Sequence, residues 1–413
     1  MEQGPLLPSL LLFRLPQDSP LRAVAQAEDW EALYGGFQQV ISLASKWGVS
    51  GNIWQLCLCW ELIRNENPWS LACESAGDPG GTLSRLAQED LTNLKDLFFE
   101  RFSWLDPSLQ RALLQFDPGD RQATPAGTLA AQLRDALAQS RNPQEAQELL
   151  ARFYQRQGLG EFALSRAFRL DNGGSLVPVQ SVKRTSLHDL VGYDAQKAQL
   201  AENTLAFLTG KPSNNVLLYG DAGTGKSTSI RSLLTDFSST SLRLVELSTA
   251  QLALLAPLMA SLRERRYRFI LFIDDLSFEE HETGYKHLKA VIEGGLETMP
   301  DNVRIYATSN RRHLIKETWK DKADMEHDGD IHRSDTVEEK LSLASRFGVA
   351  INFPSPVRKE YHQIVLSLAK KQLSSFEEER LLLEADRWEI RHGGISGRTA
   401  QQFIDYKAGL EQA

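Results

Sequence analysis

Residues 214–228 read NNVLLYGDAGTGKST, and this stretch decides the fold. An apolar run, 215–219, is followed by Gly220-Asp-Ala-Gly-Thr-Gly-Lys-Ser227, which fits the spacing G-x-x-x-x-G-K-[ST]. Glycines let the backbone wrap closely around phosphates, and the N–H groups that open the next helix face the anion. The order strand, loop and helix (227–235) is the one this mechanism requires. The stretch therefore predicts a phosphate-binding loop in an α/β domain.

The loop residues divide into nucleotide and metal ligands. Lys226 is expected to reach the β- and γ-phosphates, and Ser227 to ligate Mg²⁺. The residues expected to contact the nucleotide are Gly220, Asp221, Ala222, Gly223, Thr224, Gly225, Lys226, Ser227 and Thr228. A glycine-rich turn without any ligand is the structural alternative.

A second signal is the apolar run 269–273, which ends in Asp274-Asp275. A carboxylate at a strand end beside the phosphate loop is what Mg²⁺ capture needs, so Asp274 is assigned to the metal, through water. Asp275 would orient or deprotonate the attacking water. Glu is more usual at that place, and Asp275 is one methylene shorter. Glu279 and Glu280 are weaker substitutes, and the alternative is a carboxylate that caps the next element.

Five short runs indicate the architecture of the central region. They are 215–219, 243–247, 268–274, 303–309 and 349–353. Near-continuous apolar runs that alternate with helical stretches predict a parallel sheet covered on both faces. We therefore expect an α/β core over 171–355, in which 171–185 is a linker or edge segment. A helical subdomain is expected over 356–413, with helices at 359–372 and 376–390.

The first part, 1–170, is expected to be a mostly helical domain. Apolar residues recur at helical spacing in 127–140 and 143–156. Six of the eight tryptophans lie here, which indicates a separate aromatic core. An alternative use of these aromatic side chains is a surface that binds an unknown protein partner.

Composition sets limits on function. The chain has 413 residues and a net charge of −8, from 46 basic and 54 acidic residues, which argues against a bulk nucleic-acid coat. The arginine-rich run 263–268 could contact nucleic acid, but a cationic helix end is favoured. Cys57, Cys59 and Cys73 fit a reducing cytosol and inert core positions. No run reaches the ~20 apolar residues of a membrane span, so a cytoplasmic protein without a membrane partner is expected.

A polar interruption covers residues 316–340. It holds nine acidic and five basic residues, with His327 and His332 beside several carboxylates. Such charge-rich tracts rarely join a core, so a solvated loop is favoured over a metal site.

Several strings occur in an order that identifies a family. The strand 303–309 ends in Ala307-Thr-Ser-Asn310, residues 343–348 read LASRFG, and Gly397-Arg398-Thr-Ala400 lies in the helical tail. Leu190-Val-Gly192-Tyr193 precedes the loop by some 28 residues. With the loop and its acidic partner, these strings resemble the AAA+ ATPases. The resemblance implies a five-stranded parallel sheet, a C-terminal helical lid and ring assembly.

The resemblance also implies roles for single residues. Asn310 resembles sensor 1, which reads the γ-phosphate and helps place water. Arg346 resembles the arginine finger that projects into a neighbouring subunit's site. Arg398 resembles sensor 2, through which the lid touches the nucleotide. Val191 and Gly192 resemble the stretch that lies against adenine.

Each assignment has a structural alternative. Asn310 could be a turn residue, and Arg346 a surface or helix-end cation. Arg398 could be a helix residue in a salt bridge. Arg311 and Arg312 are second finger candidates or solvated side chains.

Longer strings point to a narrower family. FALSRAF (162–168), LVGYDAQKAQLAENTLAFLTG (190–210) and IYATSNRRHLI (305–315) resemble, with the loop, the bacterial AAA+ family known as domain of unknown function 815. The resemblance covers roughly 150–410. Ser345 departs from it, since Asp is expected before the finger, and this puts the finger's geometry in question.

The expected function is Mg²⁺-dependent ATP hydrolysis that remodels a protein, or a DNA, partner in a homo-oligomer. Lys226, Asp275, Asn310 and Arg346 form the expected catalytic set, and Ser227 and Asp274 the metal set. The choice of ATP rests on the resemblance, since the chain lacks a guanine-reading N-K-x-D string. Two alternatives stay open. One is a nucleotide switch or scaffold with negligible turnover, and the other is a DNA-processing motor, which the acidic balance disfavours.

Overall fold

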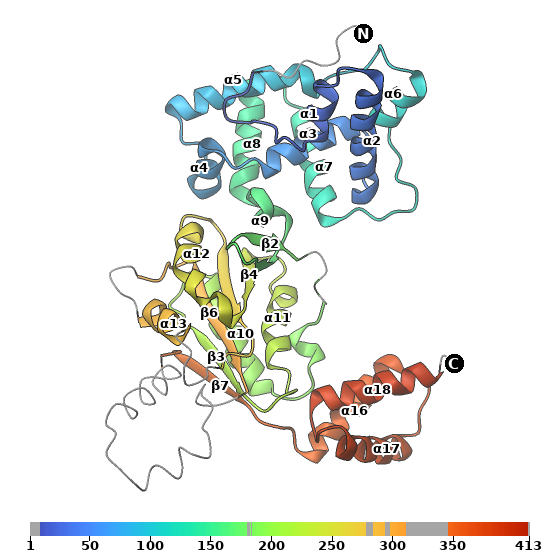
Figure 1. The fold of residues 1–413 in the computed structure, drawn as a ribbon, viewed down its shortest axis with the longest axis vertical. Coiled ribbons are helices and arrows are strands. Elements are labelled where there is room, and N and C mark those ends of the chain that lie inside the picture. Colours follow the sequence, from blue (N-terminus) through green and yellow to red (C-terminus); the bar gives the residue numbers. More distant parts are fainter. Residues whose placement is uncertain are drawn as a thin grey trace. The chain divides into compact units, whose positions relative to one another are not determined.

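The chain folds as two compact units (Figure 1). The computed structural model describes residues 9–179, 182, 184–277, 284–293, 298–310 and 346–411. The first unit runs to Ser165 and also includes Glu264–Arg266. The second consists of Arg166–Arg263 and Tyr267–Ala413.

The first unit is built from helices. They are α1 (Pro20–Ala25), α2 (Trp30–Trp47), α3 (Ile53–Arg64), α4 (Pro68–Ala76), α5 (Gly81–Phe98), α6 (Pro107–Leu114), α7 (Pro125–Ala138), α8 (Pro143–Gln157) and α9 (Gly160–Leu164). In four helices a proline follows a side chain that accepts hydrogen bonds from first-turn N–H groups. These capping residues are Asn67, Asp106, Thr124 and Asn142. Proline needs no N–H partner there, so each pair fixes a helix start, and the helices expected over 127–140 and 143–156 are confirmed.

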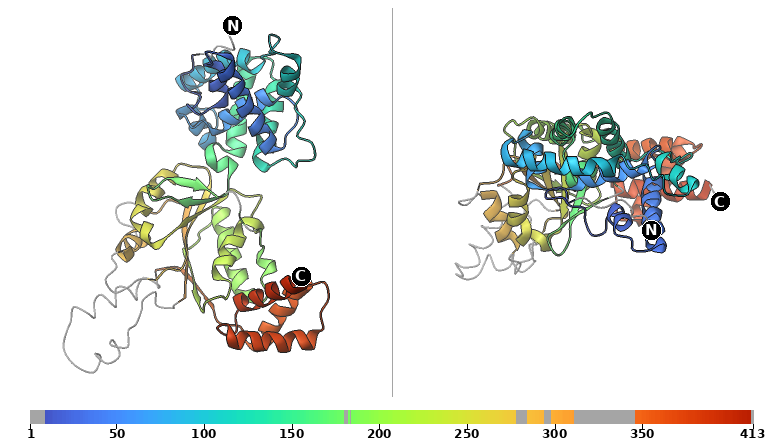
Figure 2. Two further views of the ribbon diagram at one scale, coloured as in Figure 1. Left: turned by 45° about the vertical axis from the view of Figure 1, so that its right-hand side comes forward. Right: turned by 90° about the horizontal axis from the view of Figure 1, so that it is seen from above.

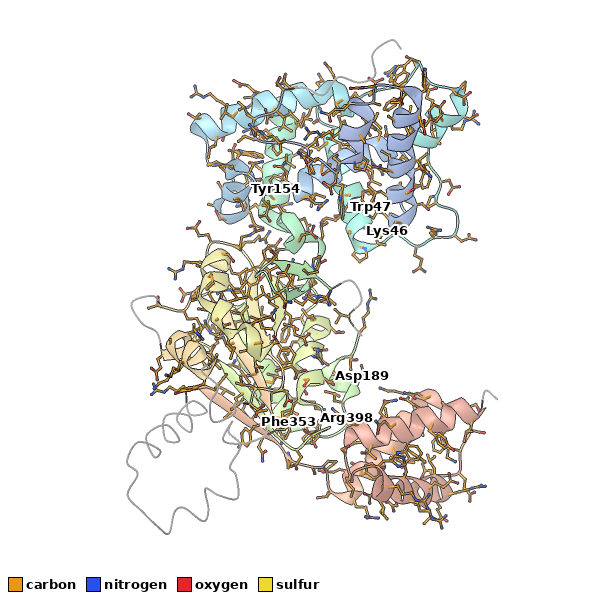
Figure 3. The ribbon with its side chains drawn as sticks, viewed as in Figure 1. Lys46, Trp47, Tyr154, Asp189, Phe353 and Arg398 are labelled. Carbon is orange, nitrogen blue, oxygen red and sulfur yellow. The ribbon has the colours of Figure 1, made fainter. Side chains whose placement is uncertain are left out.

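Aromatic side chains fill the core of the first unit. Buried in the core or packed against it are Trp47, Trp54, Trp60, Trp69 and Trp104. The indole N–H of Trp54 donates to the Leu97 carbonyl at 2.7 Å, and Tyr154 donates to the Leu62 carbonyl (Figure 3 labels Tyr154 and Trp47). The aromatic core is therefore confirmed. Trp30 departs from it, because its side chain is 49% exposed.

The cysteines belong to the same core. Cys57, Cys59 and Cys73 are buried, and burial raises the pKa of each thiol, for Cys73 to about 12. Metal binding needs the thiolate, which burial disfavours. Among the described residues, no group of three or more His, Cys, Asp or Glu is arranged to hold a metal ion. The expected burial of these cysteines in a core is confirmed.

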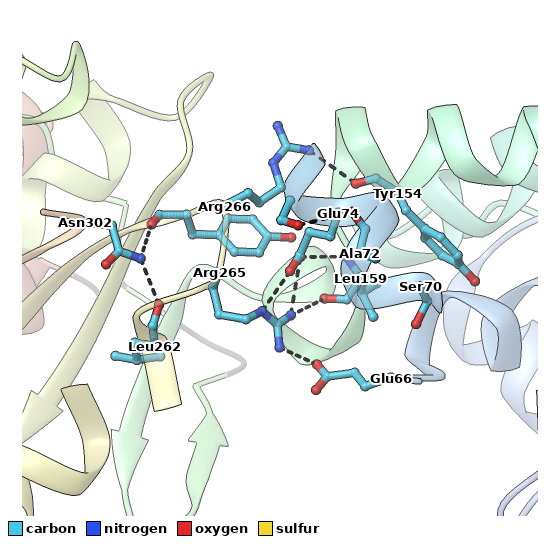
Figure 4. A network of polar contacts seen from close by, with 12 residues as sticks. Glu66, Ser70, Ala72, Glu74, Tyr154, Leu159, Leu262, Arg265, Arg266 and Asn302 are labelled. Atoms are coloured by element: carbon cyan, nitrogen blue, oxygen red, sulfur yellow. Dashed lines mark hydrogen bonds and ion pairs between the residues drawn. The ribbon is translucent and has the colours of Figure 1, made fainter. Parts of the chain in front are cut away.

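Arg265 explains why residues 264–266 belong to the first unit (Figure 4). Its Nε lies 2.8 Å from Glu74 Oε2, and its Nη1 lies 2.9 Å from Glu66 Oε1. The Glu74 side chain is only 1% exposed and that of Arg265 is 9% exposed. Arg266 donates to the Tyr154 carbonyl. These arginines of the run 263–268 are thus engaged inside the protein, which weighs against their use on nucleic acid.

The second unit contains a seven-stranded sheet with the order β2-β1-β4-β5-β6-β3-β7. The strands are β1 (Ala167–Leu170), β2 (Leu176–Pro178), β3 (Val216–Gly220), β4 (Leu242–Leu247), β5 (Arg268–Ile273), β6 (Val303–Ser309) and β7 (Val349–Phe353). All neighbouring pairs are parallel except β1 with β2. The five strands expected from the sequence are β3 to β7, and the α/β class is confirmed.

The sheet has two more strands than predicted. β1 and β2 are four and three residues long and are joined by a turn at Asp171-Asn-Gly-Gly. Strands this short show too little alternation to be recognised from sequence. They extend the β4 edge of the sheet, so the segment expected as a linker or edge is partly an edge strand.

Helices cover both faces of the sheet. On one face α10 (Asp194–Leu208) and α11 (Lys226–Asp236) share a hydrophobic cluster with alternate strand residues such as Val216 and Leu218. Leu217, which points the other way, is also fully buried. The remaining elements before the lid are η1 (Leu187–Asp189), η2 (Thr249–Leu254), α12 (Leu255–Leu262) and α13 (Gly284–Glu293). Burial on both faces explains the continuous apolar strands.

The C-terminal part of the second unit is a bundle of three helices (Figure 2). They are α16 (Arg358–Gln372), α17 (Glu378–Arg391) and α18 (Gly397–Glu411). Tyr361, Ala385 and Phe403, one from each helix, lie in a common buried cluster. This bundle is called the lid below. Across the described parts of the chain, the helices are too short or too polar to traverse a bilayer.

Candidate active site

The phosphate loop leaves β3 at Gly220 and enters α11 at Lys226. Three glycines of the loop have positive φ angles, 130° at Gly220, 77° at Gly223 and 93° at Gly225. A Cβ on Gly220 would lie 2.2 Å from the Phe353 carbonyl oxygen, so only glycine fits there. A Cβ on Gly223 would lie 3.0–3.2 Å from side-chain atoms of the lid, among them Arg398 Cβ (Figure 3 labels Phe353 and Arg398).

The first turn of α11 offers its backbone donors to a ligand. Gly225 is the N-cap, and no described side chain caps its N–H groups. Four N–H groups at a helix start have no partner within the helix, and they attract anions. Thr224 closes the loop from within by donating to the Asp221 carbonyl at 2.9 Å. Ala222 lies between the loop glycines, and Thr228 is in the first turn of α11.

The Lys226 ammonium lies under the loop. It donates to the carbonyls of Gly220 and Asp221 at 2.9 and 2.6 Å, and to Asn310 Oδ1 at 3.0 Å. Burial is the main cause of a lowered pKa of Lys226, which the carboxylates of Asp221 and Asp275 oppose. The Lys226 side chain is thus held by hydrogen bonds to neutral carbonyl oxygens. An anionic phosphate can replace these carbonyls, because a hydrogen bond between two charged groups is stronger.

Asp274 and Ser227, the two residues expected to serve Mg²⁺, are in direct contact. Ser227 Oγ donates to Asp274 Oδ1 at 2.6 Å, and Thr308 Oγ1 donates to the same oxygen at 2.6 Å. Burial alone would raise the pKa of Asp274, but these two hydrogen bonds help to bring it below its usual value. Hydroxyl and carboxylate oxygens are the donors that Mg²⁺ prefers. The donor set therefore fits Mg²⁺ bound together with nucleotide phosphates.

Arg231 holds the other oxygen of Asp274. Its Nη2 lies 2.9 Å from Asp274 Oδ2 and 2.8 Å from Glu246 Oε1. Burial tends to lower the pKa of Arg231, but the two carboxylates raise it overall. Arg231 was not among the residues predicted from the sequence. Its position four residues after Ser227 places both on one face of α11, and this helical spacing was the available signal.

Asp275 has an unusual backbone. Its φ is 53°, in the left-handed region that non-glycine residues rarely adopt. Such a conformation costs about 1–3 kcal/mol of backbone strain. Its N–H donates to Thr308 Oγ1 at 2.9 Å, and its Oδ1 accepts from Asn310 Nδ2 at 2.8 Å. Thr308, near the end of β6, and Asn310, directly after this strand, thus hold the turn after β5. Thr308, which we did not predict as a site residue, links Asp274 with Asp275.

The strand order brings these residues together. β6 lies between β5 and β3, so the carboxyl ends of the three strands are neighbours. Ser309 is in register with Tyr219 of β3, and Ala307 with Ile273 of β5. The next residue after β6 is Asn310, which therefore meets both the loop and the Asp274-Asp275 turn.

The lid and the 190–193 stretch lie beside the loop. Arg398 N–H donates to the Gly223 carbonyl at 3.2 Å, so the start of α18 contacts the phosphate loop directly. Val191 packs against the lid core, whereas Leu190 packs against the sheet core. Gly192 has a φ of 79°. The stretch expected beside adenine thus runs between sheet and lid.

Tyr193 fastens this stretch to the end of β7. Its φ is 56°, its hydroxyl donates to the Pro354 carbonyl at 2.6 Å, and its ring packs against Phe353. The Asp221 carboxylate accepts a hydrogen bond from the Ser355 N–H at 2.8 Å. This hydrogen bond is the main cause of the lowered pKa of Asp221. The Asp221 side chain therefore ties the phosphate loop to the segment that follows β7.

Arg346 is placed apart from the residues that converge on the loop. Its Nη1 lies 2.8 Å from Glu293 Oε1 in α13, and the side chain is 41% exposed. Several other sequence predictions fall outside the described residues. These are Glu279, Glu280, Arg311, Arg312, His327, His332 and Ser345.

A mostly parallel sheet with a phosphate loop, an acidic turn after β5, Asn310 directly after the strand between them and a lid beside the loop is the arrangement of a P-loop α/β fold of the AAA+ class. The family described as "Protein of unknown function (DUF815)" matches residues 163–411. The chain belongs to this family.

Solved structures show a more distant similarity. A RuvB mutant from Thermotoga maritima is 18% identical, with a TM-score of 0.39, over 56% of this chain and 69% of that one. The RuvB Holliday junction branch migration motor of the same organism is 16% identical, with a TM-score of 0.34, over 54% and 72%. A FIGL-1 AAA domain in complex with ADP is 20% identical, with a TM-score of 0.37, over 55% and 74%. No curated protein matches the chain.

Proposed function

We propose that this protein hydrolyses ATP with Mg²⁺ and uses the cycle to remodel a protein partner in a homo-oligomeric assembly. The observation that carries the proposal is the position of Asn310, which contacts both Lys226 and Asp275. A phosphate-binding cation, a carboxylate and a polar amide at one sheet edge are the groups that phosphoryl transfer to water needs.

The reaction is an in-line attack of water on the γ-phosphate. When bound, Mg²⁺ would offset charge on the phosphate oxygens between Ser227 and Asp274. Lys226 leaves its carbonyl partners and pairs with the phosphates. Asp275, held by Asn310, orients the water and accepts its proton as the bond from the γ-phosphorus to the ADP oxygen breaks.

The lid and a neighbouring subunit complete the site in this proposal. Arg398 would follow the phosphates, because its backbone already contacts Gly223. Arg346 would leave Glu293 and reach the site of the next subunit, where its charge stabilises the transition state. Hydrolysis would then depend on assembly.

An aromatic surface of the first unit is the proposed partner contact. Trp30 and Tyr34 are 49% and 48% exposed, with ring centroids 6.1 Å apart, and Trp104 lies 6.4 Å from Trp30. Exposed carboxylates in the same two segments are Glu28, Asp29, Glu31 and Asp106. Neighbouring exposed aromatic rings mark interaction sites, and we propose that these rings take basic side chains of a partner protein, because an aromatic face attracts a cation.

One observation favours a second function, a nucleotide switch with negligible turnover. Asp275 is shorter than the usual Glu, and its Oδ1 is engaged by Asn310. If this carboxylate cannot reach water, ATP would be bound and not hydrolysed, and its binding would only change the lid contact.

The deciding experiment is ATP hydrolysis as a function of protein concentration. Wild type is compared with Lys226→Ala, Arg346→Ala and Lys211→Ala, which removes an exposed lysine outside the loop. The proposal expects specific activity that rises with concentration, collapses in the first two variants and is unchanged in the third. A flat rate near zero despite tight ATP binding would favour the switch.

A further inference from the structure

Among the described residues, Arg231 is the only arginine whose guanidinium pairs with Asp274, the carboxylate expected to serve Mg²⁺. Its Nη2 is shared between Asp274 Oδ2 and Glu246 Oε1, at 2.9 and 2.8 Å. The guanidinium carbon also lies 5.3 Å from the centre of the Phe272 ring, which stabilises a cation by its π face. Three separate contacts, from β4 and β5, thus define one position for this charge.

This position matters because both oxygens of the Asp274 carboxylate already accept hydrogen bonds. Two hydroxyl groups donate to Oδ1, and Arg231 donates to Oδ2. A hydrated Mg²⁺ that uses Asp274 must approach an oxygen that already has a donor, close to a full positive charge. Like charges disfavour each other, so Arg231 opposes the metal while it keeps the carboxylate oriented.

We propose that Arg231 is a built-in counterion of the magnesium site, and that its sharing between Asp274 and Glu246 sets the Mg²⁺ concentration at which the protein binds Mg²⁺–nucleotide. The inference rests on the proposed function, since it presumes that Asp274 serves Mg²⁺. Glu246 is the tuning residue, because it draws the guanidinium away from Asp274. Removing Arg231 or Glu246 therefore has opposite effects.

Polar substitutions that change the charge or keep it are available at both residues. Arg231→Gln removes the positive charge and keeps polar atoms near the carboxylates. Glu246→Gln removes the competing negative charge, which leaves Arg231 bound to Asp274 alone. Arg231→Lys keeps the charge. A matched control, Lys211→Gln, removes one exposed positive charge outside the site.

The test is equilibrium binding of a fluorescent, non-hydrolysable ATP analogue to the full chain during a MgCl₂ titration. The readout is the Mg²⁺ concentration that gives half of the Mg²⁺-dependent binding. Arg231→Gln should lower it and Glu246→Gln should raise it, each by roughly three- to tenfold at this half-exposed pair. Arg231→Lys and Lys211→Gln should stay near the wild-type value. Far-UV circular dichroism verifies folding, and if Arg231→Gln does not fold, the rise in Glu246→Gln alone decides.

The outcomes distinguish a failure of the proposed Mg²⁺ role from a failure of the counterion role of Arg231. If wild type binds the analogue equally with MgCl₂ and with EDTA, the proposed Mg²⁺ role fails, and the inference with it. If wild type depends on Mg²⁺ but the two variants shift in the same direction, or neither shifts, the counterion role alone is overturned.

Discussion

The side-chain amide of Asn310 donates a hydrogen bond to Asp275 across 2.8 Å. The same amide accepts from Lys226 at 3.0 Å, so one residue couples the phosphate-binding cation to the candidate base. Because a φ of 53° is strained for an aspartate, the backbone conformation of Asp275 depends on outside contacts such as this one. Asn310 is thus placed to align the base proposed above with the phosphate loop.

Changes at Asp275 should therefore act on turnover and spare nucleotide binding. Asp275→Asn removes the base and should lower kcat by about 10²–10⁴-fold, the usual contribution of general-base catalysis. Asn310→Ala keeps the Asp275 carboxylate but removes the hydrogen bond that orients it, and should lower kcat less than Asp275→Asn does. Steady-state hydrolysis and calorimetric ATP binding give the two quantities. Equal loss of kcat and of ATP affinity in Asp275→Asn would show that the carboxylate holds the loop and has no role as a base.

Asp275→Glu is the matched variant for chain length. It restores the longer side chain that is more usual at this place. If wild-type turnover is limited by reach, kcat should rise in this variant, while Asp275→Asn stays inactive. Unchanged kcat would show that the shorter carboxylate already reaches the water. A negligible rate in every variant, Glu included, would favour the switch.

The lid contact predicts an effect on ATP affinity. Arg398→Ala removes the side chain next to the Gly223 contact and should weaken ATP binding by about 10- to 100-fold, as expected for a lost hydrogen bond to a charged group. Gly223→Ala places a Cβ 3.0 Å from Ser396 Oγ at a φ of 77°, and should weaken binding too. Arg391→Ala, an exposed lid arginine, is the control. Equal affinities in all variants would exclude the lid from the nucleotide site.

The fold could be predicted where the sequence has a repeating local pattern. The runs that became β3 to β6 are buried along most of their length because both faces of the sheet are covered, whereas in the edge strand β7 buried and exposed residues alternate. β1 and β2 lack such a pattern and owe their pairing to β4 and to the turn at Asp171. Their stability comes from neighbours that are distant in sequence.

The site could be predicted only in part, for a similar reason. The loop and Asp274 are recognisable because backbone geometry and metal chemistry demand those residue types at that spacing. Arg231, Glu246 and Thr308 come from three elements and have no local signature. Their roles follow from the strand order, which places β4, β5 and β6 side by side.

The proposed role of Arg346 can be tested by asking whether neighbouring subunits share an active site. Arg346→Ala should lower hydrolysis by about 10³-fold or more if the arginine acts as a finger. Lys226→Ala should be inactive as well. A mixture of the two variants contains subunits with an intact loop and subunits with an intact Arg346, so it should regain part of the activity. A mixture as inactive as its components would place Arg346 in its own subunit's structure.

The Glu293 contact supplies the control for this experiment. Glu293→Gln removes the charge that holds Arg346 at 2.8 Å. Freed from this ion pair, Arg346 should engage a neighbour more readily, so activity should reach its plateau at lower protein concentration. A higher plateau concentration would instead assign Glu293 to the assembly itself.

The aromatic surface of the first unit should bind basic peptides. A hexa-arginine peptide should quench the fluorescence of Trp30 in a salt-sensitive manner, and a hexa-glutamate peptide should not. Trp30→Ala and Tyr34→Ala should each weaken this binding, by about 3- to 30-fold. Phe99→Ala, a 42% exposed aromatic side chain outside the cluster, is the control. Binding that survives both cluster variants would refute this surface as the contact.

The ion pair of Arg265 and Glu74 predicts a large effect on stability. Arg265→Met leaves a carboxylate that is only 1% exposed without its cation, and should destabilise the first unit by about 3–5 kcal/mol. The double variant Arg265→Met/Glu74→Gln removes the unpaired charge and should recover most of this loss. Urea unfolding followed by tryptophan fluorescence measures both, because six of the eight tryptophans belong to this region.

The loss of stability in Arg265→Met should depend on pH, because it comes from the charge of Glu74. Burial raises the pKa of Glu74, while Arg265 lowers it, so the pKa must rise further in Arg265→Met. A carboxyl group whose pKa is raised in the folded state binds a proton more tightly there than in the unfolded chain, and it destabilises the fold above that pKa. The stability gap between Arg265→Met and wild type should therefore narrow as the pH falls from 8 towards 5. A gap that is independent of pH would mean that the variant loses only packing, and that Glu74 finds another partner.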